Sequence, residues 1–493
     1  MRAISDPLSL DLYNVRGSSA IIYIGPVVNN LITENPYKPG EIIPELAERW
    51  EVSSDSKTVT FFLRAGVLWH DGKPFTSADA LYNLQRAWKP PTPDIGTNAS
   101  VFKSVINIEA PDDRTVRVTL AQPSAAFIPA IAQPTMAMYP AHIPDMKVWQ
   151  DNPIGTGPFI WKSYVRAQSI DYVRNDKYFK PGLPYLDGIN QVFVLDNAAA
   201  YAALKLGQVD VSSPMDTTAL SPHLDSIQQE IPDIQNFPGT GARYDFYLNQ
   251  RPPLTDPRVR LAIHLGVDRK TVVDLWYSAG RGTVPVAGLY PTNLGGLWGL
   301  SQDELRQMPG FREKKDEDLA RAKQLLADAG VAPGTKLQVM VGTFQAAGAP
   351  AIKAVLDKIG FNAQLLIEDA APSAARLRSG DYDIFLSSIP AYYDDPASNL
   401  STIATSTGPV NYGKWSFPEI DALTAQQDAT LDAAKRAPLI RQLQFKVIEA
   451  AHVITIFWSQ NQMAWHSWVK NQPHWTTTLG PQWRFDQVWL DRT

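Results

Sequence analysis

The sequence predicts an α/β fold with more than one domain, and three observations lead to this prediction. The chain has 493 residues, of which 44% are hydrophobic and 19% are charged, so it is long enough for more than one hydrophobic core. Helical and strand-like segments alternate over residues 316–387, which is typical of crossover units in a parallel or mixed sheet. A strand, a turn and a helix also follow one another within residues 46–88.

The clearest local pattern is this strand–turn–helix unit. TVTFFL at 58–63 is rich in β-branched and aromatic residues, as expected of a half-buried strand. HDGKP at 70–74 is dense in turn-forming residues. Thr76 or Ser77 can then cap a helix whose apolar residues recur at helical spacing up to Trp88.

Periodic segments continue toward the C-terminus. Asp256 can cap a helix that opens with Pro257, a residue favoured at the first helical position. Further helices are expected at 316–329, 351–359 and 432–450. Strands are expected at 337–341, 363–367, 384–387 and 453–458.

The strand–turn–helix segment also carries residues of a known signature at fixed spacing. They are Leu46, Ala47, Trp50, Glu51, Asp55, Phe62, Leu63, Arg64, Trp69, His70, Asp71, Gly72, Pro74, Phe75, Asp79 and Arg86. In this pattern the segment resembles the extracytoplasmic solute-binding proteins of family 5, which serve peptide and nickel ABC importers. GTGPF at 155–159 and DPRVRLAIHLGVDRKTVV at 256–273 also resemble the family. The resemblance extends over about residues 6–470.

The resemblance implies a two-lobed periplasmic-binding-protein fold of the class II type, with a hinge and an extra inserted α+β domain. Crossing strands between the lobes are expected near Pro158 and Tyr247. The expected divisions are 1–38, 157–246 and 471–493 for lobe I, 39–156 for its inserted domain, and 247–470 for lobe II.

Composition limits the function classes. The formal net charge of -5 argues against a nucleic-acid partner, because phosphate binding needs a basic surface. The absence of cysteine excludes disulfides, thiolate metal sites and a cysteine nucleophile. With no apolar stretch of 18 or more residues, the chain as written is expected to be soluble, a signal peptide having been removed.

Catalytic, nucleotide and metal motifs find little support. GTGPF at 155–159 is not followed by Lys and Ser or Thr, and Pro158 removes a donor, so a phosphate loop is disfavoured. His466 and His474 are the histidine pair that comes nearest to a metal site, but packed or solvated histidines are the favoured interpretation. No cofactor, no metal and no enzymatic reaction are therefore expected.

The ligand-reading segment of the family follows the expected strand 384–387. Peptide binders resemble GWxxDxxxP there, and their Asp pairs with the α-ammonium of the peptide. In this chain Ser388 and Ile389 occupy the Gly and Trp positions, Pro390 follows, and Tyr392 occupies the Asp position. A phenol does not neutralise a buried ammonium, although a shifted alignment would supply Asp394 instead.

Other candidate ligand contacts lie elsewhere in the chain. Arg376 matches the position where dipeptide-binding members hold an Arg against the ligand carboxylate, and a solvated helix arginine is the alternative interpretation. Trp415 and Trp458 are candidates for aromatic lining of the site. Arg16 and Ser18 complete the candidate set.

The expected function is that of an ABC importer's substrate-binding protein. It would capture a peptide or peptide-like organic solute between two closing lobes and deliver it to membrane permease subunits. The alternative ligand is a non-peptide solute without a free amine, such as an organic acid or amide, and less so a sugar or metal chelate. An enzyme on this scaffold and a chaperone are further alternatives. A monomer in the periplasm or another extracytoplasmic location is expected, with or without a lipid anchor.

Overall fold

The chain folds into two compact units. Unit 1 lies within residues 1–239 and 461–493, and unit 2 within 240–391 and 395–460. The computed structural model describes residues 1–3, 7, 9–13, 20–38, 40–91, 99–213, 217–276, 283–284, 288–290, 298–390, 395–396, 400–408, 410–473 and 481–492.

Unit 1 is built on two four-stranded sheets. The first has the order β4 (Ala47–Val52), β5 (Thr58–Leu63), β7 (Thr115–Leu120), β6 (Val105–Asp112), with all neighbours antiparallel. The second has the order β1 (Arg2–Ala3), β10 (Gly188–Phe193), β9 (Ser169–Arg174), β8 (Phe159–Val165). Two short pairs add β2 (Ile32–Glu34) with β3 (Ile42–Pro44), and β17 (Val469–Lys470) with β18 (Trp489–Leu490).

The predicted strand–turn–helix unit is confirmed in unit 1. Val59, Phe61 and Leu63 of β5 are buried and alternate with half-buried residues, as the sequence pattern requires. Helix α2 (Ser77–Trp88) is capped by Thr76, whose backbone N–H donates to the Asp79 carboxylate at 3.0 Å. The other helices of this unit are α1 (Ile21–Ile24), α3 (Ala99–Phe102), α4 (Phe127–Ala132), α5 (Met146–Asp151), α6 (Asn197–Lys205), α7 (Thr217–Leu220) and α8 (Ile227–Glu230).

A large hydrophobic cluster joins distant segments of unit 1. It joins Phe61 and Leu84, from the segment expected to form an inserted domain, to Ile21, Phe159 and Trp483 from the rest of the unit. The expected inserted domain at 39–156 therefore shares a core with its neighbours, and its independence as a domain stays a prediction.

Unit 2 contains a six-stranded mixed sheet with the order β12 (Thr283–Val284), β16 (Val453–His466), β11 (Ile234–Leu248), β15 (Ile384–Pro390), β13 (Thr335–Gly342), β14 (Phe361–Glu368). Strand β13 pairs in parallel with β14 and β15, whereas β11 and β15 are antiparallel. This confirms the predicted parallel or mixed sheet. The helices of this unit are α9 (Pro257–Gly266), α10 (Arg269–Trp276), α11 (Gln302–Gln307), α12 (Asp316–Asp328), α13 (Ala349–Ile359), α14 (Ala370–Ser379), α15 (Leu400–Ile403), α16 (Pro418–Asp428) and α17 (Ala433–Ala450).

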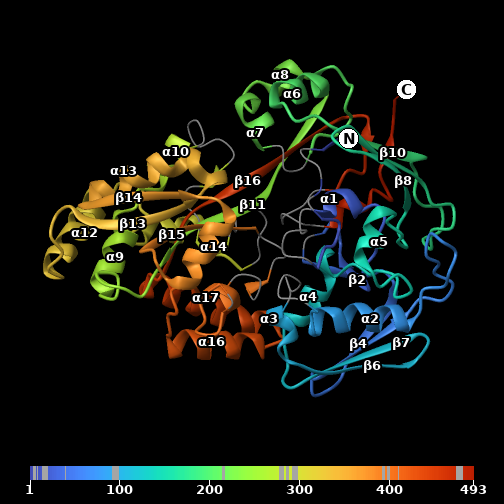
Figure 1. Cartoon of the computed structure of the whole chain (residues 1–493), viewed down its shortest axis with the longest axis horizontal. Coiled ribbons are helices and arrows are strands. Elements are labelled where there is room, and N and C mark those ends of the chain that lie inside the picture. The colour runs from blue at the N-terminus through green and yellow to red at the C-terminus, as the bar shows by residue number, and fades with distance from the viewer. Residues whose placement is uncertain are drawn as a thin grey trace. The chain divides into compact units, whose positions relative to one another are not determined.

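The apolar faces of these helices build a second core. Helices α9, α12 and α13 gather around β13 and β14 (Figure 1). Their buried residues and the inner face of the sheet form one cluster, which includes Ile263, Leu326, Leu356, Phe246 and Ile456. The burial of these side chains is the main stabilising contribution in this unit.

Two long strands, β11 and β16, carry the chain from one unit into the other. Strand β11 contains the division at 239/240, and β16 contains the division at 460/461. Pro158, where a crossing was expected, lies inside unit 1. Strand β16 continues to His466, well past the expected end at 458. Because residues 453–466 are buried along almost their whole length, the sequence has no polar–apolar alternation to mark where the strand ends. Within the described ranges, no helix is long and apolar enough to cross a membrane.

Candidate functional site

The two N-terminal signature segments contact each other through His70. Its Nδ1 accepts a hydrogen bond from the Gly155 backbone N–H at 3.2 Å, and its Nε2 donates to the Gly157 carbonyl at 3.1 Å. The His70 backbone N–H donates to the Gly155 carbonyl at 2.9 Å. This pattern requires the neutral ring with its proton on Nε2. Burial accordingly lowers the pKa of His70 to about 4.

The glycines of the GTGPF segment are needed for close backbone packing. A Cβ on Gly155 would lie 1.8 Å from the Val27 carbonyl oxygen, and one on Gly157 would lie 2.4 Å from the Val27 carbonyl carbon. The Gly157 N–H donates to the Val27 carbonyl at 2.8 Å. Because these backbone groups are used inside the fold, the segment has a structural role, in line with the prediction that it is not a phosphate loop.

In unit 2, one face of the sheet brings the predicted ligand-reading strand against a buried charge pair. The register of β11 and β15 places Ile389 opposite Arg243, and Ser387 opposite Asp245. Directly opposed residues of an antiparallel pair share a face of the sheet. Ser388 is opposed to Tyr244 and therefore belongs to the other face.

The Arg243 side chain is fully buried and has one donor group to spare. Its Nε lies 2.9 and 2.8 Å from the two carboxylate oxygens of Asp245, and its Nη1 donates to the Leu289 carbonyl at 2.9 Å. The Asp245 side chain is also fully buried and accepts from Thr455 Oγ1 at 2.9 Å. Nη2 of Arg243 has no hydrogen-bond partner among the described residues. A buried guanidinium with an unused donor is a group that an acceptor can satisfy.

The two predicted tryptophans are buried in unit 2 and use their indole donors internally. Trp458 is 0% exposed, its Nε1 donates to the Gly288 carbonyl at 3.0 Å, and its ring centroid lies 5.7 Å from the Arg243 guanidinium. Trp415 is 5% exposed and donates to the Leu248 carbonyl at 2.6 Å. Of the two, Trp458 lies next to the charge pair.

Arg376 is engaged by carboxylates of its own unit. Its Nε and Nη2 donate to Glu368 at 3.1 and 2.7 Å, and its Nη1 donates to Asp381 at 2.5 Å. Its side chain is 27% exposed. Two carboxylates thus balance the charge of the Arg376 guanidinium, which was expected to bind the ligand carboxylate. The binding role of Arg376 stays a prediction.

The other five candidate residues lie at the end of β15 or outside the described residues. Pro390 is the last residue of β15, while Tyr392, Asp394, Arg16 and Ser18 lie outside the described residues. The neighbouring Asp395 is buried and bonded by Arg436, with Nη1 and Nη2 at 2.6 and 2.9 Å from its two oxygens. Asp395 is therefore neutralised inside unit 2.

Sequence reasoning missed the Arg243–Asp245 pair, although a signal was present. In ARYDFYLN the two opposite charges are two residues apart within a strand, and this spacing places both on one face. Two charges on one face of an otherwise apolar strand indicate a buried pair or a binding group.

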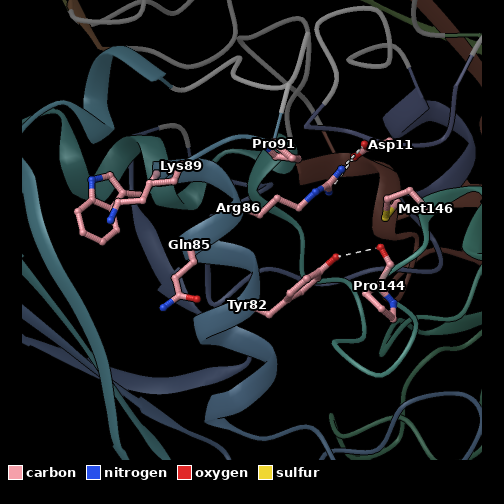
Figure 2. Close-up of a pocket in the computed structure, with 9 residues that line it drawn as sticks. Asp11, Tyr82, Gln85, Arg86, Lys89, Pro91, Pro144 and Met146 are labelled. Atoms are coloured by element: carbon pink, nitrogen blue, oxygen red, sulfur yellow. Dashed lines mark hydrogen bonds and ion pairs between the residues drawn. The ribbon is translucent and has the colours of Figure 1, made fainter. Parts of the chain in front are cut away.

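Unit 1 has an open pocket of about 610 Å³ beside the C-terminal half of α2 (Figure 2). Tyr82, Gln85 and Lys89 line it at intervals of three and four residues, which places them on one side of the helix. Pro144 and Met146 form the opposite wall, and the Tyr82 hydroxyl donates to the Pro144 carbonyl at 3.4 Å.

A buried ion pair closes the base of this pocket. Arg86 donates through Nη1 to one oxygen of Asp11 at 3.1 Å and through Nη2 to the other oxygen. The two side chains are 6% and 7% exposed, and the guanidinium lies 4.9 Å from the Tyr13 ring centroid. Oδ1 of Asp11 also accepts from the Tyr13 backbone N–H at 3.1 Å. Both carboxylate oxygens are thus bonded by Arg86, and the pair carries no net charge.

No group of three or more metal-ligating side chains occurs in the part of the chain that the structure describes. His466 is bonded on both ring nitrogens, to Asp233 at 2.8 Å and to the Leu204 carbonyl at 2.8 Å. His474 lies outside the described residues. The expected absence of a metal stays a prediction.

Comparisons with known proteins agree with this architecture. The chain is 27% identical to the probable deoxycholate-binding periplasmic protein YgiS of Escherichia coli K12, over 92% of this chain and 86% of the relative. It is 28% identical to di/tripeptide-binding protein 1 of Pseudomonas aeruginosa UCBPP-PA14, over 87% and 83% of the two chains. The solved structure of the periplasmic binding protein AgaA from A. tumefaciens R10, in complex with agropinic acid, matches with a TM-score of 0.81 at 26% identity, covering 99% of this chain and 98% of the other. A family model matches residues 41–411, and the chain belongs to the bacterial extracellular solute-binding proteins, family 5.

Proposed function

We propose that this protein is the solute-binding receptor of an ABC importer. It captures an organic solute outside the cytoplasm, as a monomer, and delivers it to membrane permease subunits. The observation that carries this proposal is the family match over residues 41–411, together with a fold of two units joined by β11 and β16. No reaction on the bound solute is part of this proposal, because the matched family consists of solute-binding proteins.

The names of the similar proteins cover several kinds of solute. One relative is named for deoxycholate and another for di- and tripeptides, and a structural neighbour holds agropinic acid. Their identities to this chain are all between 26% and 28%. The ligand must therefore be argued from the residues of this chain.

The favoured solute is peptide-like, bears an acceptor group and lacks a free α-amine. Arg243 has a spare donor opposite Ile389, in the strand that leads to the expected ligand-reading segment. The carboxylates described beside this segment, Asp245 and Asp395, are each bonded by a buried arginine, so neither would compensate an ammonium. Tyr392 stands where peptide binders of the family keep their Asp.

Calorimetry with one dipeptide in its free and N-acetylated forms tests this ligand class. The acetylated form should bind as well as or better than the free form, because it brings no ammonium to be desolvated. Tyr392→Asp should reverse this order, whereas Tyr185→Asp, at an exposed tyrosine of unit 1, should leave it unchanged. A free dipeptide that binds while its acetylated form does not would overturn the ligand class and make Asp394 the amine partner.

A further inference from the structure

The pocket beside α2 has the size and chemistry of a small-molecule site. Its volume of about 610 Å³ falls inside the range of ordinary ligand pockets. Its walls combine the rings and apolar groups of Trp88, Pro91, Pro144 and Met146 with a few polar groups. Pockets that fix a ligand usually have this composition, with an apolar body and a small number of polar contacts.

The charges of this pocket favour an anionic or acceptor-bearing ligand over a cation. Its carboxylate, Asp11, is bonded through both oxygens by Arg86, so it has little capacity left for an ammonium. Lys89 is exposed, lies 3.9 Å from the Trp88 ring centroid and has no carboxylate partner in the described parts of the chain. Among the described residues that line the pocket, Lys89 thus carries a positive charge with no ion-pair partner, beside an aromatic ring.

The polar groups next to Lys89 can complete the recognition of such a ligand. Burial raises the pKa of Tyr82, so its phenol stays protonated at neutral pH, and it keeps a lone pair as its O–H points to Pro144. Gln85 is exposed one helical turn from Lys89 and carries an amide donor. In Figure 2 Tyr82 points from α2 toward Pro144, and Gln85 points the other way, toward the side on which Lys89 lies.

We infer that this pocket binds a carboxylate attached to an apolar, ring-containing body. The carboxylate lies against Lys89 and Gln85 beside the Trp88 ring, and the apolar body extends along Tyr82 toward Met146. The inference goes beyond the proposed function, because it assigns a binding site of its own to residues that all lie within unit 1.

The test uses one peptide with four combinations of end groups, and a signal from inside the pocket. The probes are Phe-Phe with a free or acetylated N-terminus and a free or amidated C-terminus. The protein carries ¹³C-methyl methionine, and Met146→Leu assigns the Met146 signal among its eight methionines. The acetylated carboxylate should shift the Met146 methyl, and the acetylated amide should bind about fivefold more weakly, because it lacks the charge that pairs with Lys89.

Two matched variants separate recognition from folding. Lys89→Gln should bring the carboxylate-to-amide ratio of affinities close to one, while Lys177→Gln, at an exposed lysine of unit 1 outside the pocket, should leave it near five. Trp88→Leu should weaken both acetylated probes alike. An unmoved Met146 signal, or an unchanged ratio in Lys89→Gln, would overturn the inference.

The outcomes also distinguish this inference from the proposed function. Binding of the acetylated probes detected by calorimetry, with no change at Met146, would overturn the pocket as a binding site and leave the receptor role intact. A shift at Met146 in a protein that supports no uptake of any solute would leave the pocket as a binding site and contradict the receptor role.

Discussion

Lowering the pH from about 7.5 to about 4.5 should destabilise unit 1 through the protonation of His70. The folded structure holds this ring neutral, because Nδ1 accepts from Gly155 and Nε2 donates to Gly157. Its pKa is lowered from 6.5 to about 4 by burial. Between these two values the unfolded chain binds more protons than the folded one, so stability is present above pH 6.5 and is lost as the pH falls toward 4.

The magnitude follows from the two pKa values. For pKa values of 6.5 unfolded and about 4 folded, the linkage at pH 4.5 amounts to about 2.5 kcal/mol. The ring is half-buried, and solvent screening reduces the expected loss to about 1–2 kcal/mol. The loss should be concentrated where His70 joins the turn before α2 to residues 155–157.

Two non-titrating variants isolate this contribution. His70→Asn keeps an acceptor for the Gly155 N–H, and His70→Gln keeps a donor for the Gly157 carbonyl. Hydrogen exchange at the Gly155 and Gly157 amides, with urea unfolding at each pH, measures the local and global free energies of unfolding. Both variants should be less stable than the parent at pH 7.5 and should lose about 1–2 kcal/mol less than the parent on acidification. Equal acid losses in the parent and both variants would refute the assignment of a neutral His70.

Three further outcomes are expected. Gly157→Ala should destabilise unit 1 by about 1–3 kcal/mol in urea unfolding, because the new Cβ would lie 2.4 Å from the Val27 carbonyl carbon; an unchanged midpoint would contradict this close packing. Arg243→Met should cost unit 2 about 3–5 kcal/mol because it leaves the Asp245 carboxylate buried without its cation. The double variant with Asp245→Leu should recover part of that loss, and equal losses would contradict a buried ion pair. Elemental analysis of untagged protein should find no stoichiometric transition metal, because the chain has no cysteine; metal that survives chelation would count against this prediction.

The elements of the fold were predictable where the pattern was local. The strand at 58–63 alternates with a period of two, and α2 has a capping residue and a helical apolar period, so both were found from short windows. The helix–strand alternation after residue 316 predicted a parallel or mixed sheet for the same reason. Strand β16 was found only in part because a strand buried along its length lacks the alternation that marks its end.

The contacts of the candidate site residues in unit 2 depend on pairings between distant parts of the chain, which no local sequence pattern contains. Ile389 was identified by its position in a segment, but its neighbour Arg243 follows from the register between β11 and β15. The indole N–H groups of Trp458 and Trp415 likewise donate to carbonyl groups far away in the sequence, those of Gly288 and Leu248. Composition could indicate that aromatic residues were numerous, but it could not indicate which of them had their donors already used.

Arg376 illustrates a different difficulty. The resemblance supplied its position, but the charge available to a ligand depends on nearby carboxylates that a motif does not include. Glu368 and Asp381 lie close to it in sequence, yet their bonds to the guanidinium arise because the end of β14 and the end of α14 meet around it. Charges flanking a motif residue should therefore be considered together with the motif.

The receptor role is tested most directly by uptake in the source cells. Solutes bound to the isolated protein are identified by mass spectrometry, and the uptake of a labelled solute is then compared between the parent strain and a strain that lacks this gene. The account predicts that uptake falls to background in the deletion strain and returns when the gene is restored. The deletion strain could instead take up every solute that the protein binds at the parental rate, even at limiting solute concentration. That result would contradict the assignment as an importer receptor.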